Sequence, residues 1–333
     1  MTQATIAPRT VGAAAVEREP SERLSVVVHS RRLDGPDVVV LDLRRPDGGA
    51  LPPAAPGAHL DVHLPGGLIR QYSLAGDSAD RNRYVLGVLR APDSRGGSAA
   101  VHAHLHEGAG LEVSPPRDAF PLVDRGGRAL LLAGGIGITP LLAMARLLAA
   151  EGRPFELHYS VRERARLAFL PDLDALGASV HLHVDGEGAP LDLAGLAHGR
   201  GARDDVYVCG PPGFIDGTTE TLIRLGWPAG AVHTERFTRE QPGREGSFTV
   251  EAKRSGVRCA VREGQSIAQA LAEAGVPVSL SCESGVCGTC LTPVVAGVPE
   301  HRDDYQTDAE KAANSMVTIC CSGSRTDLLV LDL

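Results

Sequence analysis

The sequence predicts a multidomain protein: an antiparallel β-barrel, an α/β unit with a parallel sheet, and a smaller α+β unit. Three observations support this prediction. The chain has 333 residues, enough for two or three domains with separate cores. Its hydrophobic pattern changes near Arg128 from short strands to strands alternating with helices, and four cysteines lie near the C-terminal end.

The first strands follow a short N-terminal segment. Residues 1–23 mix Ala, Thr, Pro and charged residues without an apolar core, which predicts a disordered tail rather than an export signal. Between residues 24 and 122, short runs rich in Val, Leu and Tyr are separated by Gly- and Pro-containing turns. These runs are 25–29, 38–43, 59–64, 70–74 and 84–89. Short strands separated by turns in this way predict an antiparallel β-barrel.

The second unit spans residues 123–238. An apolar strand at 130–133 leads into a glycine turn and a helix at 141–150, and further strands are expected at 156–159, 180–184 and 206–209. Strands that alternate with helices form a parallel sheet. A polar stretch with Gly and Pro, residues 239–246, is predicted to be a linker.

The third unit, residues 247–333, begins with an expected hairpin at 247–252 and 258–261 and a helix at 267–274. It carries 11 acidic and 7 basic residues, a net charge of −4, which is half of the formal charge of −8 for the whole chain. The chain as a whole has no basic excess, so no nucleic-acid partner is expected. Its apolar runs are broken by Gly, Pro and Arg, so no membrane span is expected and the protein is predicted to be soluble.

The four cysteines follow the spacing C-x4-C-x2-C-x29-C: Cys282, Cys287, Cys290 and Cys320. This is the plant-type [2Fe–2S] pattern. A zinc site and a disulfide framework fit less well, because only one close cysteine pair is present and the chain is long. Cys321 directly follows Cys320, and the spacing favours Cys320 as the fourth ligand.

Two short motifs in the first unit suit a flavin. The sequence R-x-Y-S on a strand supplies an arginine for a phosphate, an aromatic ring to pack on an isoalloxazine and a hydroxyl near its reactive nitrogen: Arg70, Tyr72 and Ser73. About twenty-five residues later, a glycine loop precedes a helix and offers its N–H groups to a phosphate: Gly96, Gly97 and Ser98.

Two glycine turns in the second unit suit a dinucleotide. The first contains Gly135, Gly137 and Thr139, and the second contains Cys209, Gly210 and Pro211. Both follow strands whose carboxyl ends should share one edge of the sheet, where ligands of such sheets bind. Cys209 is a candidate neighbour of the nicotinamide, and its alternative role is that of a small buried hydrophobe.

The nicotinamide cofactor is predicted to be NADH, with NADPH as the alternative. The alternative stays open because an arginine and an acidic residue, Arg162 and Glu163, both follow a strand of this sheet. An acidic residue there favours a ribose hydroxyl, whereas an arginine favours a 2′-phosphate.

Taken in chain order, these motifs resemble the phthalate dioxygenase reductase family, which includes the vanillate O-demethylase reductases. The resemblance covers residues 24–333. It implies an FMN-binding barrel, an NADH-binding domain and a C-terminal ferredoxin domain of the β-grasp fold, the first two being like ferredoxin–NADP reductases. In that family the electrons pass to a separate oxygenase.

The resemblance also implies roles for individual residues. Those expected near the reacting atoms are Ser73, Cys209, Glu235 and Phe237, with Phe237 against the flavin. Those expected to bind the flavin are Arg70, Tyr72, Ser73, Leu89, Gly96, Gly97 and Ser98. Those expected to bind the nicotinamide dinucleotide are Gly135, Gly137, Thr139, Arg162, Cys209, Gly210 and Pro211.

The sequence therefore predicts a cytoplasmic, monomeric reductase that passes electrons from NADH through FMN and a [2Fe–2S] cluster to a terminal oxygenase of the Rieske type. Alternatives are a redox partner of a cytochrome P450, the use of FAD, and a non-catalytic iron–sulfur electron carrier. Intact flavin and nucleotide motifs argue against the last of these.

Overall fold

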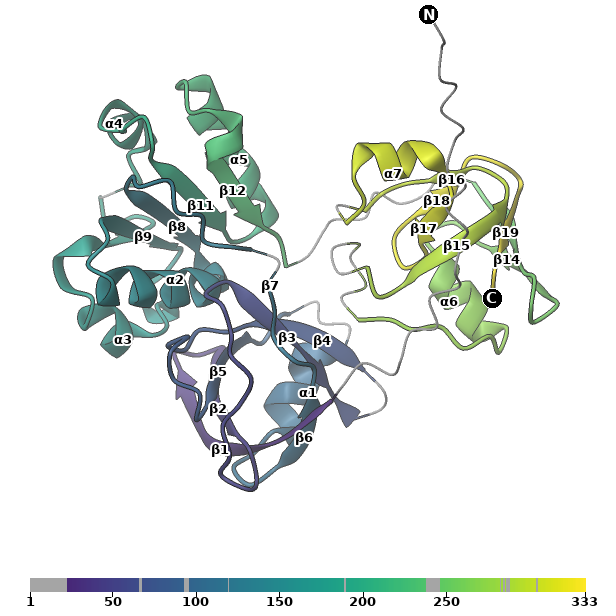
Figure 1. The fold of residues 1–333 in the computed structure, drawn as a ribbon, viewed down its shortest axis with the longest axis horizontal. Helices are drawn as coiled ribbons and strands as arrows, with labels where there is room; N and C mark the ends of the chain where they lie inside the picture. Colours follow the sequence, from purple (N-terminus) through teal and green to yellow (C-terminus); the bar gives the residue numbers. More distant parts are fainter. Residues whose placement is uncertain are drawn as a thin grey trace, which may run out of the picture.

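Three units follow one another along the chain, each with its own sheet (Figure 1). The computed structural model describes residues 23–65, 68–92, 96–118, 120–188, 190–237, 246–281, 283, 285, 288–303 and 305–333. Most of the predicted tail and linker, together with Cys282 and Cys287, lies outside these ranges. Within them, no helix has the length and apolar character required to cross a bilayer.

The first unit is an antiparallel sheet that curls on itself. Its elements are β1 (Leu24–Asp34), β2 (Val38–Arg44), β3 (Ala58–His63), β4 (Ile69–Ser73), β5 (Tyr84–Leu89), α1 (Gly97–His104), β6 (Gly110–Val113) and β7 (Arg117–Asp118). The strand order is β4-β3-β6-β1-β2-β5, and β7 pairs with β3. A single bridge, between Leu74 and Leu86, joins the two ends of this order. The strands of the predicted barrel are therefore present, but only one bridge joins the two ends of the order, and no continuous ladder closes the sheet within the described residues.

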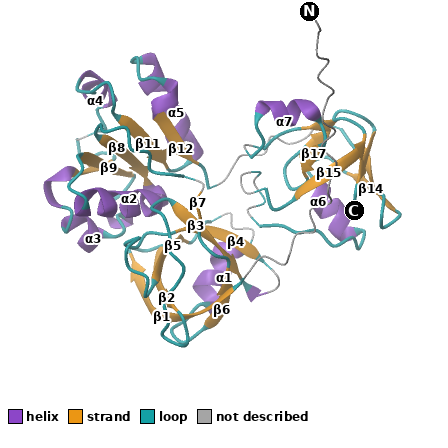
Figure 2. Cartoon of the chain, in the orientation of Figure 1, coloured by secondary structure: helices purple, strands orange, loops and turns teal. Residues whose placement is uncertain are grey.

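The second unit has a five-stranded parallel sheet in the order β10-β9-β8-β11-β12. Its elements are β8 (Ala129–Gly134), α2 (Ile138–Ala150), β9 (Phe155–Val161), α3 (Leu170–Asp174), β10 (Val180–Val184), α4 (Leu193–His198), β11 (Asp205–Cys209), α5 (Pro212–Arg224) and β12 (Val232–Glu235). Alternate strand residues pack on α2 and α3 on one face and on α4 and α5 on the other (Figure 2). Burial of both faces explains the nearly continuous apolar strands in this unit.

The third unit packs one helix against a mixed sheet in the order β14-β13-β19-β15-β17. Its elements are β13 (Phe248–Ala252), β14 (Val257–Val261), α6 (Ile267–Glu273), β15 (Leu291–Ala296), β16 (Pro299–Glu300), α7 (Asp308–Ala313), β17 (Met316–Thr318), β18 (Gly323–Ser324) and β19 (Leu328–Leu331). Ile267 and Leu271 of α6 are fully buried in this core. A capping box between Ser266 and Gln269 begins the helix and satisfies its first N–H groups.

Candidate functional site

Three side chains from separate strand ends meet where the first two units touch. Ser73 ends β4, Cys209 ends β11 and Glu235 ends β12. In the parallel ladder Cys209 lies directly opposite Glu235. The Ser73 hydroxyl donates to Oε2 of Glu235 at 3.4 Å, and the Cys209 thiol lies 4.0 Å from the same oxygen. The structure thus brings together three of the four residues that the sequence analysis places near the reacting atoms.

Burial controls the charge of this group of side chains. It raises the pKa of Glu235 to about 8, although the Ser73 hydrogen bond opposes the rise, and Asp118 adds to it. Burial and the neighbouring Glu235 also raise the pKa of the Cys209 thiol well above its usual value. At pH 7 the thiol is therefore neutral and the carboxyl group is mostly protonated.

The two glycine turns of the second unit are packed directly on each other. A Cβ atom at Gly137 would lie 2.2 Å from the carbonyl oxygen of Cys209, so only glycine fits there. Thr139 is buried, and its hydroxyl donates to the Ile136 carbonyl at 3.0 Å. Gly210 and Pro211 follow β11 and lead into α5. The backbone at this edge can accordingly approach a ligand closely, as the sequence predicts for a pyrophosphate.

Leu89 and Phe237 flank the same junction. Both are partly buried, and both pack against the main core of the second unit, although Leu89 belongs to the first. Arg162 lies beyond the carboxyl end of β9 and is exposed, as is its neighbour Glu163. The two side chains therefore lie at the sheet edge expected for the ribose, and the geometry fits either role.

The predicted phosphate loop and the arginine of the R-x-Y-S motif lie side by side. Gly96 precedes α1 in the left-handed region (φ 87°), and Gly97 packs on the Arg70 side chain, where an added Cβ would lie 2.5 Å from Cγ. Ser98 Oγ accepts a hydrogen bond from the Ala91 backbone N–H at 3.2 Å. Tyr72 packs on the barrel core, and burial raises its pKa to about 12. These residues fit a flavin phosphate and ring.

The two described cysteines of the predicted cluster set are both buried. Cys290 and Cys320 are each 4% exposed, and the Ile319 N–H donates to the Cys290 carbonyl at 3.4 Å, which ties the two segments together. Cys321 is equally buried, and its sulfur lies 3.3 Å from the Thr318 hydroxyl. Buried thiol donors such as Cys290 and Cys320 fit an iron–sulfur cluster. Burial does not distinguish the adjacent thiols, so the choice of Cys320 rests on spacing.

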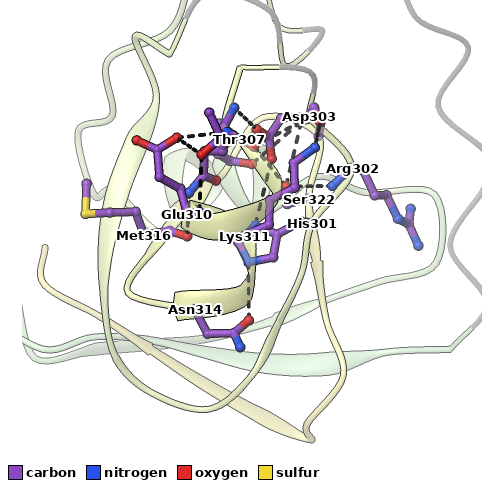
Figure 3. Close-up of polar contacts among 12 residues, drawn as sticks. His301, Arg302, Asp303, Thr307, Glu310, Lys311, Asn314, Met316 and Ser322 are labelled. Atoms are coloured by element: carbon purple, nitrogen blue, oxygen red, sulfur yellow. Dashed lines mark hydrogen bonds and ion pairs between the residues drawn. The ribbon is translucent and has the colours of Figure 1, made fainter.

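A polar network holds the segment that packs beside these cysteines (Figure 3). Asp303 accepts a hydrogen bond from the Gln306 N–H at 2.7 Å, and its carbonyl accepts one from Lys311 at 2.6 Å. The Arg302 N–H donates to Ser322, two residues after Cys320, at 3.3 Å. These contacts connect the segment of Arg302 and Asp303 to Ser322, next to the cysteine pair.

The segment that carries Cys282, Cys287 and Cys290, called the cysteine loop below, contacts the barrel through Ser281 and Glu283. Ser281 donates to Asp61 at 2.8 Å, and Arg117 pairs with the same carboxylate oxygen at 2.5 Å. Arg70 pairs with Glu283 at 2.6 Å. Sequence reasoning missed Asp61, Ser281 and Glu283, because the contacts join positions more than 200 residues apart and no local motif marks them.

Comparison with known proteins agrees with the cysteine pattern and with the order of the units. Residues 250–323 match the family model described as a 2Fe-2S iron-sulfur cluster binding domain. The chain is 44% identical to the vanillate O-demethylase oxidoreductase of Pseudomonas sp. (strain HR199 / DSM 7063), over 93% of this chain and all of that protein. The solved structure of phthalate dioxygenase reductase superimposes with a TM-score of 0.76 at 38% identity, covering 93% of this chain and 98% of that one.

A type IV self-sufficient cytochrome P450 monooxygenase also contains this architecture. The match has a TM-score of 0.75 at 35% identity and covers 95% of this chain but 43% of that one. The three units thus define the class of modular iron–sulfur reductases. Within it, the chain belongs to the family of phthalate dioxygenase reductase and the vanillate O-demethylase oxidoreductases.

The raised pKa of Glu235 predicts a pH-dependent stability. Between pH 4.5 and about 8 the folded chain keeps a proton that the unfolded chain releases, so the free energy of unfolding falls as pH rises. Each pKa unit of difference is worth about 1.4 kcal/mol. Glu235→Gln should therefore gain stability relative to the parent chain as pH rises from 5 to 8, in thermal unfolding followed by circular dichroism. The exposed Glu220→Gln is the matched control, and parallel pH curves for Glu235→Gln and the parent would contradict the expectation.

Spacing predicts different consequences for the adjacent cysteines. Cys320→Ser should lose the cluster, whereas Cys321→Ser should keep it, because a plant-type cluster takes its fourth thiolate from a single position. Iron content per chain and the visible spectrum of each purified variant test this directly. Full iron in Cys320→Ser together with loss in Cys321→Ser would reverse the assignment.

Proposed function

We propose that this protein is the reductase component of an oxygenase system: it takes electrons from NADH and delivers them through FMN and a [2Fe–2S] cluster. The observation that carries this proposal is the meeting of Ser73, Cys209 and Glu235 at the junction of barrel and sheet. A nicotinamide at the sheet edge and a flavin on the barrel would face each other at that point. The names of two relatives, a vanillate O-demethylase oxidoreductase and a phthalate dioxygenase reductase, support the same reaction class.

Bound FMN supplies the chemistry that connects a two-electron hydride donor to a one-electron cluster. The residues of the chain would bind the flavin and orient it. Arg70 and the N–H groups at the start of α1 would hold the phosphate, and the Ser73 hydroxyl, which donates to Glu235, would lie beside the ring. Neutral Glu235 keeps a proton at the junction and avoids placing a negative charge beside a transferred hydride.

The same proposal assigns one cofactor to each of the three units. Residues 24–122 would bind FMN, residues 123–238 NADH, and residues 247–333 the cluster, with Cys282, Cys287, Cys290 and Cys320 as its ligands. The loop contacts of Asp61 with Ser281 and of Arg70 with Glu283 would keep the cluster beside the flavin. Short separation favours electron transfer between them.

For the electron acceptor we propose a separate terminal oxygenase of the Rieske type. Support comes from the relatives, which include a vanillate O-demethylase oxidoreductase and a phthalate dioxygenase reductase. A cytochrome P450 is the second candidate, since the same architecture is fused to one in a solved structure. Reduction of purified Rieske and P450 proteins from the neighbouring genes would separate the two: only the true partner should be reduced at a rate matching turnover.

Loss of the Ser73 hydroxyl should slow hydride transfer. Ser73→Ala is expected to reduce the rate of anaerobic flavin bleaching by NADH by about 100-fold, the scale for one positioned hydrogen-bond donor. Stopped-flow absorbance measures this rate. Ser30→Ala, on an exposed position of β1, is the control. An unchanged rate in Ser73→Ala would remove the hydroxyl from the mechanism.

Loss of a cluster ligand should separate flavin reduction, which is retained, from electron transfer to an external acceptor, which is lost. Cys290→Ser is expected to retain NADH-dependent flavin reduction but to lose cytochrome c reduction, because the outlet for single electrons is missing. The two activities are measured on the same preparation. Cys259→Ser, which changes a half-buried cysteine outside the ligand set, should retain both. Equal loss of both activities in Cys290→Ser would contradict the proposed order of transfer.

A further inference from the structure

A group of imidazole and carboxylate side chains lies away from the proposed redox site, on the face of the second sheet that α4 and α5 partly cover. Glu156 and His158 belong to β9, and His181 and His183 belong to the edge strand β10. His158 lies directly opposite His181 in the parallel ladder. Because alternate residues of a strand share a face, all four side chains point to the same side of the sheet.

Three of these residues can place ligand atoms around one point. One ligand atom each from Glu156, His158 and His181 lies within 4.8 Å of the other two. A tetrahedral zinc ion with bonds of about 2.0–2.1 Å needs ligand atoms roughly 3.3 Å apart, so modest closure is required. His181 is exposed, so its ring can turn from its present stacking on His158 without disturbing the core.

The most buried member of the group is already oriented as metal-binding histidines are. His158 is 7% exposed; its Nδ1 lies 3.0 Å from Nε2 of His183, and its Nε2 lies 3.5 Å from the Glu156 carboxylate. A ligating histidine normally donates its second ring N–H to an acceptor, which fixes its orientation. His183 can be that acceptor, which leaves the His158 Nε2 lone pair directed toward Glu156.

The one cation beside the group among the described contacts is itself paired. Arg128 binds Oε1 of Glu156 at 2.6 Å and Asp204 at 3.3 Å. The first contact holds the carboxylate in place and leaves Oε2, the oxygen that faces His158, available to a metal. The charge of Arg128 is offset by two carboxylates and so does not repel an incoming divalent cation strongly.

We propose that Glu156, His158 and His181 form a binding site for a divalent transition metal of the zinc class, with His183 orienting His158. Two imidazoles and one carboxylate are a donor set that suits zinc and leave a fourth position for water. The metal would join β9 to β10, an edge strand that pairs with β9 alone in the described sheet. The metal would therefore hold the edge strand β10 to the rest of the sheet, at a site separate from the iron–sulfur cluster.

Zinc binding to the full-length protein, loaded with flavin and two irons per chain, tests the site. Equilibrium dialysis with metal analysis should show one zinc per chain beyond the iron, and saturating zinc should raise the thermal unfolding temperature. His181→Ala removes an exposed ligand without opening the core, and should weaken zinc affinity at least about 100-fold and abolish the rise in unfolding temperature. His183→Gln should weaken affinity about 10-fold while leaving the site intact.

His29→Ala, an exposed histidine on β1, is the matched control and should behave as the parent chain does. The iron content and NADH oxidation of all variants should stay unchanged, because the site lies outside the electron path. The proposal is overturned if the parent binds no zinc beyond its iron, or if His181→Ala binds zinc as tightly as the parent. Unchanged affinity in His183→Gln would remove the orienting role of that ring.

Discussion

Strand β4 is the element on which the arrangement of the three units depends. It has only five residues, Ile69–Ser73, yet it contacts both of the other units. Arg70 reaches Glu283 in the cysteine loop, and Ser73 reaches Glu235 at the end of the parallel sheet. A short strand fixed in an antiparallel ladder is rigid. Glu235 and Glu283, which lie 162 and 213 residues from their partners on β4, are therefore held in fixed positions relative to the same strand. Redox groups bound around it would keep their separations, which is what stepwise electron transfer needs.

The Arg70 side chain contacts both Glu283 and the predicted phosphate loop. Its guanidinium pairs with Glu283 at 2.6 Å and also packs on Gly97 of the predicted phosphate loop. A guanidinium has five donors in a fixed plane, so one edge can serve a carboxylate while another serves a phosphate. A lysine carries its three donors on one nitrogen and offers no second edge. In the proposed function, flavin binding and placement of the cysteine loop would thereby be connected through a single side chain.

Sequence reasoning recovered those features that local patterns encode. The strand at 84–89 and the helix beginning at residue 267 were placed correctly because their apolar spacing is regular. The strands β15 to β19 were missed, since several are only two to four residues long and carry little alternation.

Glu235 was named only through the family resemblance, because the hydroxyl that it meets comes from another domain. The histidines on β9 and β10 were hidden for a related reason: sheet register places them together, and register is not visible along the chain.

The charge of the third unit bears on how electrons leave the protein. Its net charge of −4 would steer it toward a basic surface on a partner and raise the rate of encounter more than the final affinity. Such steering benefits a reductase that must meet a separate acceptor repeatedly, whereas covalent fusion, as in the P450 monooxygenase that shares this architecture, removes the need for it. The same three units therefore serve either arrangement.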